Sequence, residues 1–330
     1  MATSTPMRGR TPVTTLKFYA MYGKRIADGD ISVRSLEDVD GISERRARTI
    51  AEHVKTKGPP PDSWRVIVIG DAHFCPHHGG IGRAETIGRF ITQQAREAMD
   101  VGEKFTVVCI GDWADYASLS SYEKGKKEFE GRAIRADIHF SNEASLLLTN
   151  SIAPDAWAYM ARPPLITLGN HTAARMSRLL SDVRELEGVF GIGLEGEDAE
   201  VRPNWTDLGW EVFPFLVPAF IDDVAFLHFL PNPSNGRAVS SVSMGRALIL
   251  KGLQSVVVGH NHLFKFDKLT RLDGTKVCAC SVGCAFEHDH DWAGQIPNAA
   301  YDRGITVLNN LRGSDFNPRF YTFEEIRRVL

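Results

Sequence analysis

Five short runs of apolar, mostly β-branched residues recur between residues 61 and 330, and they constrain the fold more than any other feature. Runs of this length are too short for helices and are typical of strands buried on both faces. Segments with apolar residues at helical spacing separate several of them, most clearly at residues 84–98, 142–152 and 172–186. Strands that alternate with helices predict a layered α/β protein. The runs are residues 66–69, 105–110, 165–168, 224–227 and 255–258.

Each run ends in, or contains, a cluster of carboxylate, imidazole or amide side chains. Loops at the carboxyl ends of strands are where α/β folds build their sites, since the strand fixes the backbone and the loop presents the side chains. Glycine precedes most of these clusters, and we expect it to let the chain turn sharply. The clusters are Gly70-Asp71-Ala72-His73, Gly111-Asp112-Trp113-Ala114-Asp115, Gly169-Asn170-His171, Leu227-His228-Phe229 and Gly259-His260-Asn261-His262.

The side chains in these clusters are typical ligands of Mn²⁺, Fe²⁺ and Zn²⁺. Together they provide more candidate ligands than one ion can take. Two ions that share a carboxylate lie roughly 3.5–4 Å apart, a spacing that holds both the attacking and the leaving oxygen in phosphoryl transfer. The clusters therefore predict a two-metal site, although a histidine such as His228, taken alone, is more often a hydrogen-bonded core residue.

The ordered set Asp-x-His, Gly-Asp-x-x-Asp, Gly-Asn-His, His and Gly-His-x-His resembles the calcineurin-like metallophosphoesterase family over about residues 65–265. The resemblance implies an α/β fold, a four-layer sandwich of two central mixed sheets flanked by helices. It also implies two divalent metal ions, with Mn²⁺ preferred and Fe²⁺, Zn²⁺ or Ni²⁺ as alternatives. In the implied ligand set, Asp112 bridges the two ions, the first ion takes Asp71, His73 and His262, and the second takes Asn170, His228 and His260.

The same resemblance implies that His171 is a catalytic residue and not a metal ligand. It would stabilise a phosphoryl oxygen or protonate the leaving group, and Asp115 would orient it. A carboxylate beside an imidazole fixes the tautomer and favours the protonated form. In the family, a hydroxide that bridges the two metals attacks phosphorus in line. The resemblance thus implies a metal-dependent hydrolase of phosphate esters.

Departures from one branch of the family bear on the substrate. The Ser/Thr protein phosphatase branch has Arg-Gly directly after Gly-Asp-x-x-Asp and Glu after Gly-Asn-His, whereas this chain has Tyr116-Ala117 and Thr172. A phosphodiester carries one charge fewer and needs less cationic grip. We therefore expect a phosphodiesterase or nuclease that acts on nucleic acid, similar to bacteriophage and DNA-repair members. The alternative is a phosphomonoesterase or small (cyclic) nucleotide hydrolase with a protein-binding N-terminal segment.

Residues 1–60 differ from the rest of the chain in charge and in pattern. They hold 11 Lys/Arg against 7 Asp/Glu, a balance of +4, whereas residues 61–330 hold 27 against 34, a balance of -7. Helices are predicted at residues 15–26, after a cap at Ser35, and from Ser43. The stretch Gly58-Pro59-Pro60-Pro61 predicts a linker that no helix crosses. We therefore expect a small helical domain at 1–60 and a catalytic domain at 61–330.

Residues 39–50 resemble the helix-hairpin-helix pattern, in which turn amides and the start of the next helix hold a nucleic-acid phosphate. Ser43 stands where that pattern usually has its second glycine, and a helix-turn-helix fits the same residues. A small docking module whose arginines form a solvated face is the simpler alternative. The predicted nucleic-acid contacts are Gly41, Ser43, Arg45, Arg46 and Arg48.

Two further stretches contain residues that could bind metal or substrate. Residues 276–283 alternate like a strand, so Cys278 and Cys280 are expected on one face as core residues and not as metal ligands. The acidic, histidine-rich residues 287–291 could rim the active site, although most such loops are solvated. His77 and His78 follow the first metal motif and could approach the substrate.

The chain has five cysteines and no run approaching the roughly 18 to 20 apolar residues that a membrane helix needs. Its first residues have no apolar core of a signal peptide. We therefore expect a soluble cytoplasmic protein without a membrane partner, and the resemblance places it in a bacterial or phage-infected cell. The resemblance also allows a homodimer.

Overall fold

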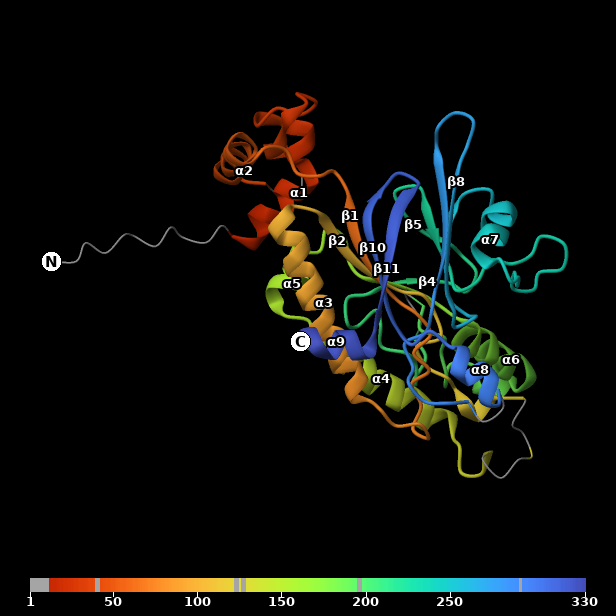
Figure 1. The fold of residues 1–330 in the computed structure, drawn as a ribbon. Coiled ribbons are helices and arrows are strands. Elements are labelled where there is room, and N and C mark those ends of the chain that lie inside the picture. Colours follow the sequence, from red (N-terminus) through yellow and green to blue (C-terminus); the bar gives the residue numbers. More distant parts are fainter. Residues whose placement is uncertain (1–11, 39–41, 122–124, 126–128, 195–197, 291–292) are drawn as a thin grey trace.

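The computed structural model describes residues 12–38, 42–121, 125, 129–194, 198–290 and 293–330. Within these residues the strands form two mixed sheets (Figure 1). The six-stranded sheet has the order β11-β10-β1-β2-β3-β4, with β1 (Trp64–Ile69), β2 (Lys104–Cys109), β3 (Leu165–Thr167), β4 (Glu211–Phe213), β10 (Gly304–Arg312) and β11 (Asp315–Thr322). The five-stranded sheet has the order β5-β6-β7-β9-β8, with β5 (Ala219–Ile221), β6 (Val224–Phe226), β7 (Ser255–Val258), β8 (Phe264–Thr270) and β9 (Lys276–Val282).

The five predicted buried strands are confirmed as β1, β2, β3, β6 and β7. β1, β2 and β3 are neighbouring parallel strands of the six-stranded sheet. β6 and β7 are neighbouring parallel strands of the other sheet. Because parallel neighbours end at the same edge of a sheet, the polar clusters that follow these strands gather at two sheet edges.

The two sheets pack face to face over a shared apolar core. Val66 and Val68 of β1 point into this core and meet residues such as Phe226 and Val257 of the other sheet. The alternate residues of β1, Ile67 among them, point to the opposite face and join the core beneath the helices. Successive residues of β1 point to opposite faces, and both faces are covered, so β1 is a continuous apolar run.

Helices cover the outer faces of both sheets. On the six-stranded sheet these are α3 (Gly82–Val101), α4 (Ile134–Asn150), α5 (Pro154–Tyr159) and α9 (Phe323–Val329), and on the five-stranded sheet α7 (Met244–Gly252). The predicted apolar face of α3 is confirmed, because Ile87, Phe90 and Ile91 are all buried in the core over the first sheet. From one side to the other, the layers are helices, sheet, sheet and helix.

Two helices differ from their predicted ranges. α4 begins at Ile134, earlier than predicted, and its first turns pack Ile134 and Ile138 into a small separate cluster. The polar residues between those two hid this face from the sequence pattern. The stretch predicted as one helix at 172–186 is a π-helical segment η4 (Asn170–Ala174), then α6 (Arg175–Asp182), then a 3₁₀ turn η5 (Arg184–Leu186). The remaining short elements are a 3₁₀ turn η2 (Ala117–Leu119) and helix α8 (Gln295–Ala300).

The N-terminal segment is helical, as predicted, with α1 (Val13–Ala27), a 3₁₀ turn η1 (Arg34–Asp38) in place of the helix expected after Ser35, and α2 (Glu44–Lys57). It has a core of its own that includes Tyr22, Leu36 and Ile50. However, α1 also places Ala20 in the core beneath α3. This segment therefore has its own core and also packs on the rest of the chain, and the boundary at residues 60 and 61 stays a prediction.

The predicted core positions of Cys278 and Cys280 on β9 are confirmed. Cys278 and Cys280 lie fully buried on the same face of the strand, within the core between the sheets. Among the described helices, none is both long enough and apolar enough to span a lipid bilayer.

The core between the sheets yields a stability prediction. Phe316 of β11 is fully buried there, and replacing it with alanine would leave a cavity. Phe316→Ala should therefore lower the free energy of unfolding, measured by urea denaturation, by about 3–5 kcal/mol. The matched control is Phe220→Ala on β5, where the ring is 47% exposed and the loss should stay below about 1 kcal/mol. Equal losses at the two sites would contradict this packing.

Candidate metal centre

The predicted ligands of the first ion lie together. Asp71 and His73 follow β1, and His262 follows β7, so the group draws on both sheets. The Nε2 atom of His262 lies 3.0 Å from Oδ2 of Asp71, and Nε2 of His73 lies 3.8 Å from the same oxygen. The other oxygen of Asp71 accepts a hydrogen bond of 3.0 Å from the backbone N–H of His260. One carboxylate oxygen is thus held by the backbone, and the other faces the imidazoles.

The predicted ligands of the second ion also lie together. The Nε2 atom of His228 is 2.8 Å from Oδ1 of Asn170 and 3.1 Å from Oδ2 of Asp112. His260 completes the group, with its ring centroid 5.1 Å from that of His228. The Nδ1–H of His228 donates to the backbone carbonyl of Ile110 at 3.0 Å, which directs Nε2 toward the group.

Asp112 lies between the two groups. Its Oδ1 accepts a hydrogen bond of 2.8 Å from the backbone N–H of His171, while its Oδ2 lies 4.0 Å from Nε2 of His73 on the first group's side. Among the described residues, both ring nitrogens of His73 are buried without a hydrogen-bond partner, and Oδ2 of Asp112 has none apart from the imidazole of His228 at 3.1 Å. A buried polar atom left unpaired costs about 1–3 kcal/mol. Divalent cations between these groups would satisfy those atoms, so the residues present fit two metal ions.

Four of the predicted ligands have left-handed backbone conformations, which non-glycine residues rarely adopt. The φ angles are 50° at His73, 35° at Asp112, 70° at His260 and 60° at His262. In the described part of the chain nine non-glycine residues have positive φ, so nearly half of them are in this site. Such conformations cost about 1–3 kcal/mol each and persist where the surrounding structure holds them.

Most of the glycines before the ligands are needed for a reason other than the predicted sharp turn. Of the four, only Gly111 has a positive φ, 96°. A Cβ at Gly169 would lie 2.0 Å from Oδ1 of Asp112, and one at Gly259 would lie 2.5 Å from Oδ1 of Asp71. These glycines leave room for a carboxylate from a neighbouring loop, so they are needed for close approach.

The charges in the site determine its protonation. Burial opposes ionisation of Asp112, yet the imidazoles of His228 and His171 hold its pKa below the usual range. Burial likewise opposes a charge on His228, but the carboxylates of Asp112 and Asp71 outweigh it and raise its pKa to about 9. Burial and the neighbouring His228 lower the pKa of His260 to about 4. In the second group, the metal-free imidazole of His228 is therefore protonated at neutral pH, whereas that of His260 is neutral.

His171 lies beside both groups, and its ring is held from two sides. Its Nδ1 lies 2.6 Å from Oδ1 of Asp115, which is the predicted pairing. Burial raises the pKa of Asp115, but the hydrogen bond from His171 and nearby positive charges hold this pKa well below its usual range. The pairing that was expected to orient the imidazole is therefore present.

Arg175 is a residue of this site that the sequence pattern did not reveal. Its guanidinium donates to the backbone carbonyl of Asp115 at 2.6 Å, and its Nη2 lies 3.2 Å from Nε2 of His171. Arg175 stands one helical turn after His171, at the start of α6. The spacing of four residues was the available signal, because residues four apart on a helix share a face.

The predicted nucleic-acid contacts form no part of these ligand groups. Gly41 lies outside the described residues. Ser43 precedes α2 as its N-terminal cap residue, and Arg45 is exposed. Arg46 is half-buried beside the ring of Phe18, and Arg48 forms an ion pair with Glu44 on the same helix. The arrangement is compatible with a solvated face, and contact with nucleic acid stays a prediction.

A scan against protein-family models finds no match, and neither does a search of curated proteins. Function must therefore be inferred from the geometry of the site and from the resemblance of its motifs.

The raised pKa of His228 predicts a pH dependence of metal binding. Below about pH 9 the metal-free imidazole holds a proton that a cation must displace, so apparent affinity should rise about tenfold per pH unit between about pH 6 and 8. Competition of Mn²⁺ with a chromophoric chelator measures this slope. Titration calorimetry in buffers of different ionisation enthalpy should show about one proton released. A flat affinity over this range would contradict the assignment of His228.

Proposed function

We propose that this protein is a dinuclear-metal-dependent phosphoesterase of the calcineurin-like type. The observation that carries the proposal is the convergence of five loops from two sheets on one buried carboxylate, that of Asp112. Random Gly-Asp and Gly-His pairs would not bring seven ligand-type side chains into two adjoining groups. The arrangement of two face-to-face sheets with helices outside supports the metallophosphoesterase sandwich as the fold.

In this proposal the chain's own residues hold the cations. Asp71, His73 and His262 hold one cation, while Asn170, His228 and His260 hold the other, and Asp112 reaches both. When bound, two divalent cations supply Lewis-acid activation of water and of phosphoryl oxygens. Mn²⁺ is the proposed occupant, because carboxylate, amide and imidazole ligands without thiolates suit it.

His171 is the proposed catalytic residue that handles a proton. Asp115 accepts from Nδ1–H, which leaves Nε2 as the atom that faces the substrate side. The guanidinium of Arg175 lies within hydrogen-bond distance of Nε2 in this arrangement. For His171 to protonate a leaving oxygen, Nε2 must first take a proton and Arg175 must turn away. Arg175 is then free to meet a phosphate oxygen.

We further propose that the substrate is a phosphodiester, and specifically nucleic acid. The position directly after Gly-Asp-x-x-Asp is Tyr116, so the arginine that grips a phosphate dianion in the phosphatase branch is missing there. The balance of +4 in residues 1–60 supports a polyanionic substrate.

A phosphomonoesterase or small-nucleotide hydrolase is the second candidate, and Arg175 is the observation that favours it. Its guanidinium lies beside His171, with its side chain 19% exposed. A positive charge at this place could replace the missing arginine and bind a dianion.

The first proposal is tested by turnover with Mn²⁺. Bis(p-nitrophenyl) phosphate should be cleaved faster than p-nitrophenyl phosphate, and Asp112→Asn should lower kcat/KM by more than about 100-fold and reduce the bound Mn²⁺. Asp273→Asn, an exposed carboxylate in the turn between β8 and β9, is the matched control and should change neither quantity. Faster monoester cleavage would favour the second candidate. If Asp112→Asn loses metal but the wild type hydrolyses neither substrate, the metal site stands and the proposed phosphoesterase activity is contradicted.

The role of the N-terminal segment is tested by reversing charge instead of deleting it, since removing α1 would take Ala20 out of the main core. The double variant Arg45→Glu with Arg48→Glu should cleave DNA more slowly and lower the salt dependence of binding by about two ions, with small-substrate turnover unchanged. The variant Lys55→Glu with Lys57→Glu makes the same charge change at the other end of α2. Equal effects of the two double variants would argue against contact at the start of this helix.

A further inference from the structure

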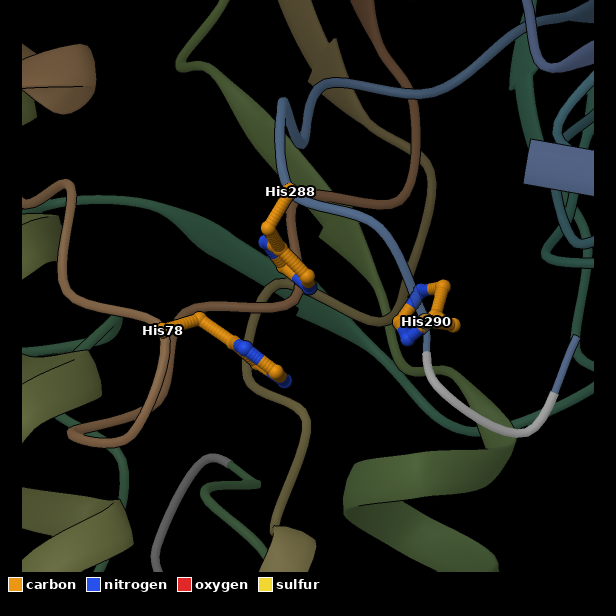
Figure 2. Close-up of side chains that lie close together, drawn as sticks. All are labelled: His78, His288 and His290. Atoms are coloured by element: carbon orange, nitrogen blue, oxygen red, sulfur yellow. The ribbon is translucent and has the colours of Figure 1, made fainter. Parts of the chain in front are cut away.

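Three histidines outside the dinuclear group form a second imidazole cluster. His78 lies in the loop after β1, whereas His288 and His290 lie in the loop after β9. Figure 2 shows the three rings gathered around one space from these two loops. One nitrogen from each lies within 4.8 Å of the others. We propose that His78, His288 and His290 bind a third divalent cation of the kind that prefers imidazole, with Zn²⁺ as the probe.

The loop that contributes two of these histidines is fixed by hydrogen bonds. The side chain of the buried Asn298 accepts from the backbone N–H of His290 and donates to its backbone carbonyl, both at 2.9 Å. Arg303 donates to the carbonyl of Glu287 at 3.2 Å. His290 itself is 4% exposed, so the loop is not the solvated segment that is usual for acidic, histidine-rich sequences. The backbone around His290 is therefore held in place before any ligand arrives.

The chemistry of the cluster selects the class of cation. Three imidazoles with open coordination positions are a known arrangement for Zn²⁺, with nitrogen–metal distances of about 2.0–2.1 Å. Ligand nitrogens around such an ion lie roughly 3.4 Å apart, so the rings must rotate to close the difference from 4.8 Å and to turn the near-parallel planes of His78 and His288 toward one ion. Mg²⁺ and Ca²⁺ require oxygen ligands, which this cluster does not provide.

The geometry also favours a cation over a bound anion. The rings of His78 and His288 stack with centroids 3.9 Å apart and planes 10° from parallel. Protonating both rings to attract an anion would put two like charges at this separation, where they repel. Neutral imidazoles with a shared cation avoid that repulsion. A different grouping of His78 with Asp115 is less suitable, because Asp115 already bonds to His171 and Arg175.

The cluster adjoins the dinuclear group without sharing a ligand with it. The ring centroids of His290 and His73 lie 5.2 Å apart. The centroid of the fully buried Phe286 ring lies 4.7 Å from that of His290 and 5.1 Å from that of His73. Phe286 also contacts His262 at 4.9 Å. One apolar ring thus packs against both sets of ligands, and the two sites can be emptied separately by mutation.

The test counts ions in the full chain. Metal-stripped protein is equilibrated with excess Zn²⁺ and desalted, and bound zinc is measured by elemental analysis. The wild type should hold three ions per chain, whereas His78→Ala and His288→Ala should each hold two. His77→Ala is the matched control, because His77 is the exposed neighbour of His78 and lies outside the cluster, and it should still hold three.

Two further variants keep the result interpretable. His78→Gln and His288→Gln preserve side-chain volume, and circular dichroism with thermal melting confirms that each variant folds. The same zinc count in the wild type and in the folded variants would overturn the proposal, as would an equal loss in His77→Ala. This outcome is separate from the failure of the proposed function. Asp112→Asn should lose ions from the dinuclear group and keep the one held by the three histidines.

Discussion

The buried carboxylate of Asp112 is the interaction on which the rest of the site depends. Its Oδ1 is held by the backbone N–H of His171, and its Oδ2 faces His228 at 3.1 Å and His73 at 4.0 Å. These partners come from loops after β1, β3 and β6, so the carboxylate joins the edges of both sheets. Without cations, its charge is balanced by protonated imidazole, which is why the pKa of His228 is raised.

This arrangement is locally strained and brings charged groups into close contact. Packing in the two surrounding cores supplies the free energy that offsets this strain. Left-handed backbone at four ligands is unfavourable, as is the burial of several charged groups together. The core between the sheets and the core beneath the helices hold the loops in place from both sides. Glycines such as Gly169 matter because their missing Cβ lets Asp112 approach the neighbouring loop. A rigid scaffold therefore maintains a site that would not form by itself.

The site is larger than the motifs that resemble the metallophosphoesterase pattern indicate. Arg175 contacts both His171 and Asp115, so a positively charged guanidinium lies beside the imidazole that is proposed to transfer a proton. On the other side, Phe286 packs against both His73 and His290, so it contacts the predicted dinuclear ligands and the cluster of His78, His288 and His290. Under our proposals, the metal-rich region extends from the dinuclear group into that cluster, and the negative balance of residues 61–330 would be partly offset by bound cations.

The sequence by itself determined the strands, the residue types at their ends and the shared face of Cys278 and Cys280, because the periodicity of apolar residues is a local property. The mixed two-sheet architecture and the grouping of the predicted ligands agree with those expectations. Only the tertiary structure decided that the loop of His78 meets that of His288, and that Gly169 lies against Asp112. Contacts of this kind depend on how two sheets stack and where distant loops end, and no local pattern encodes that.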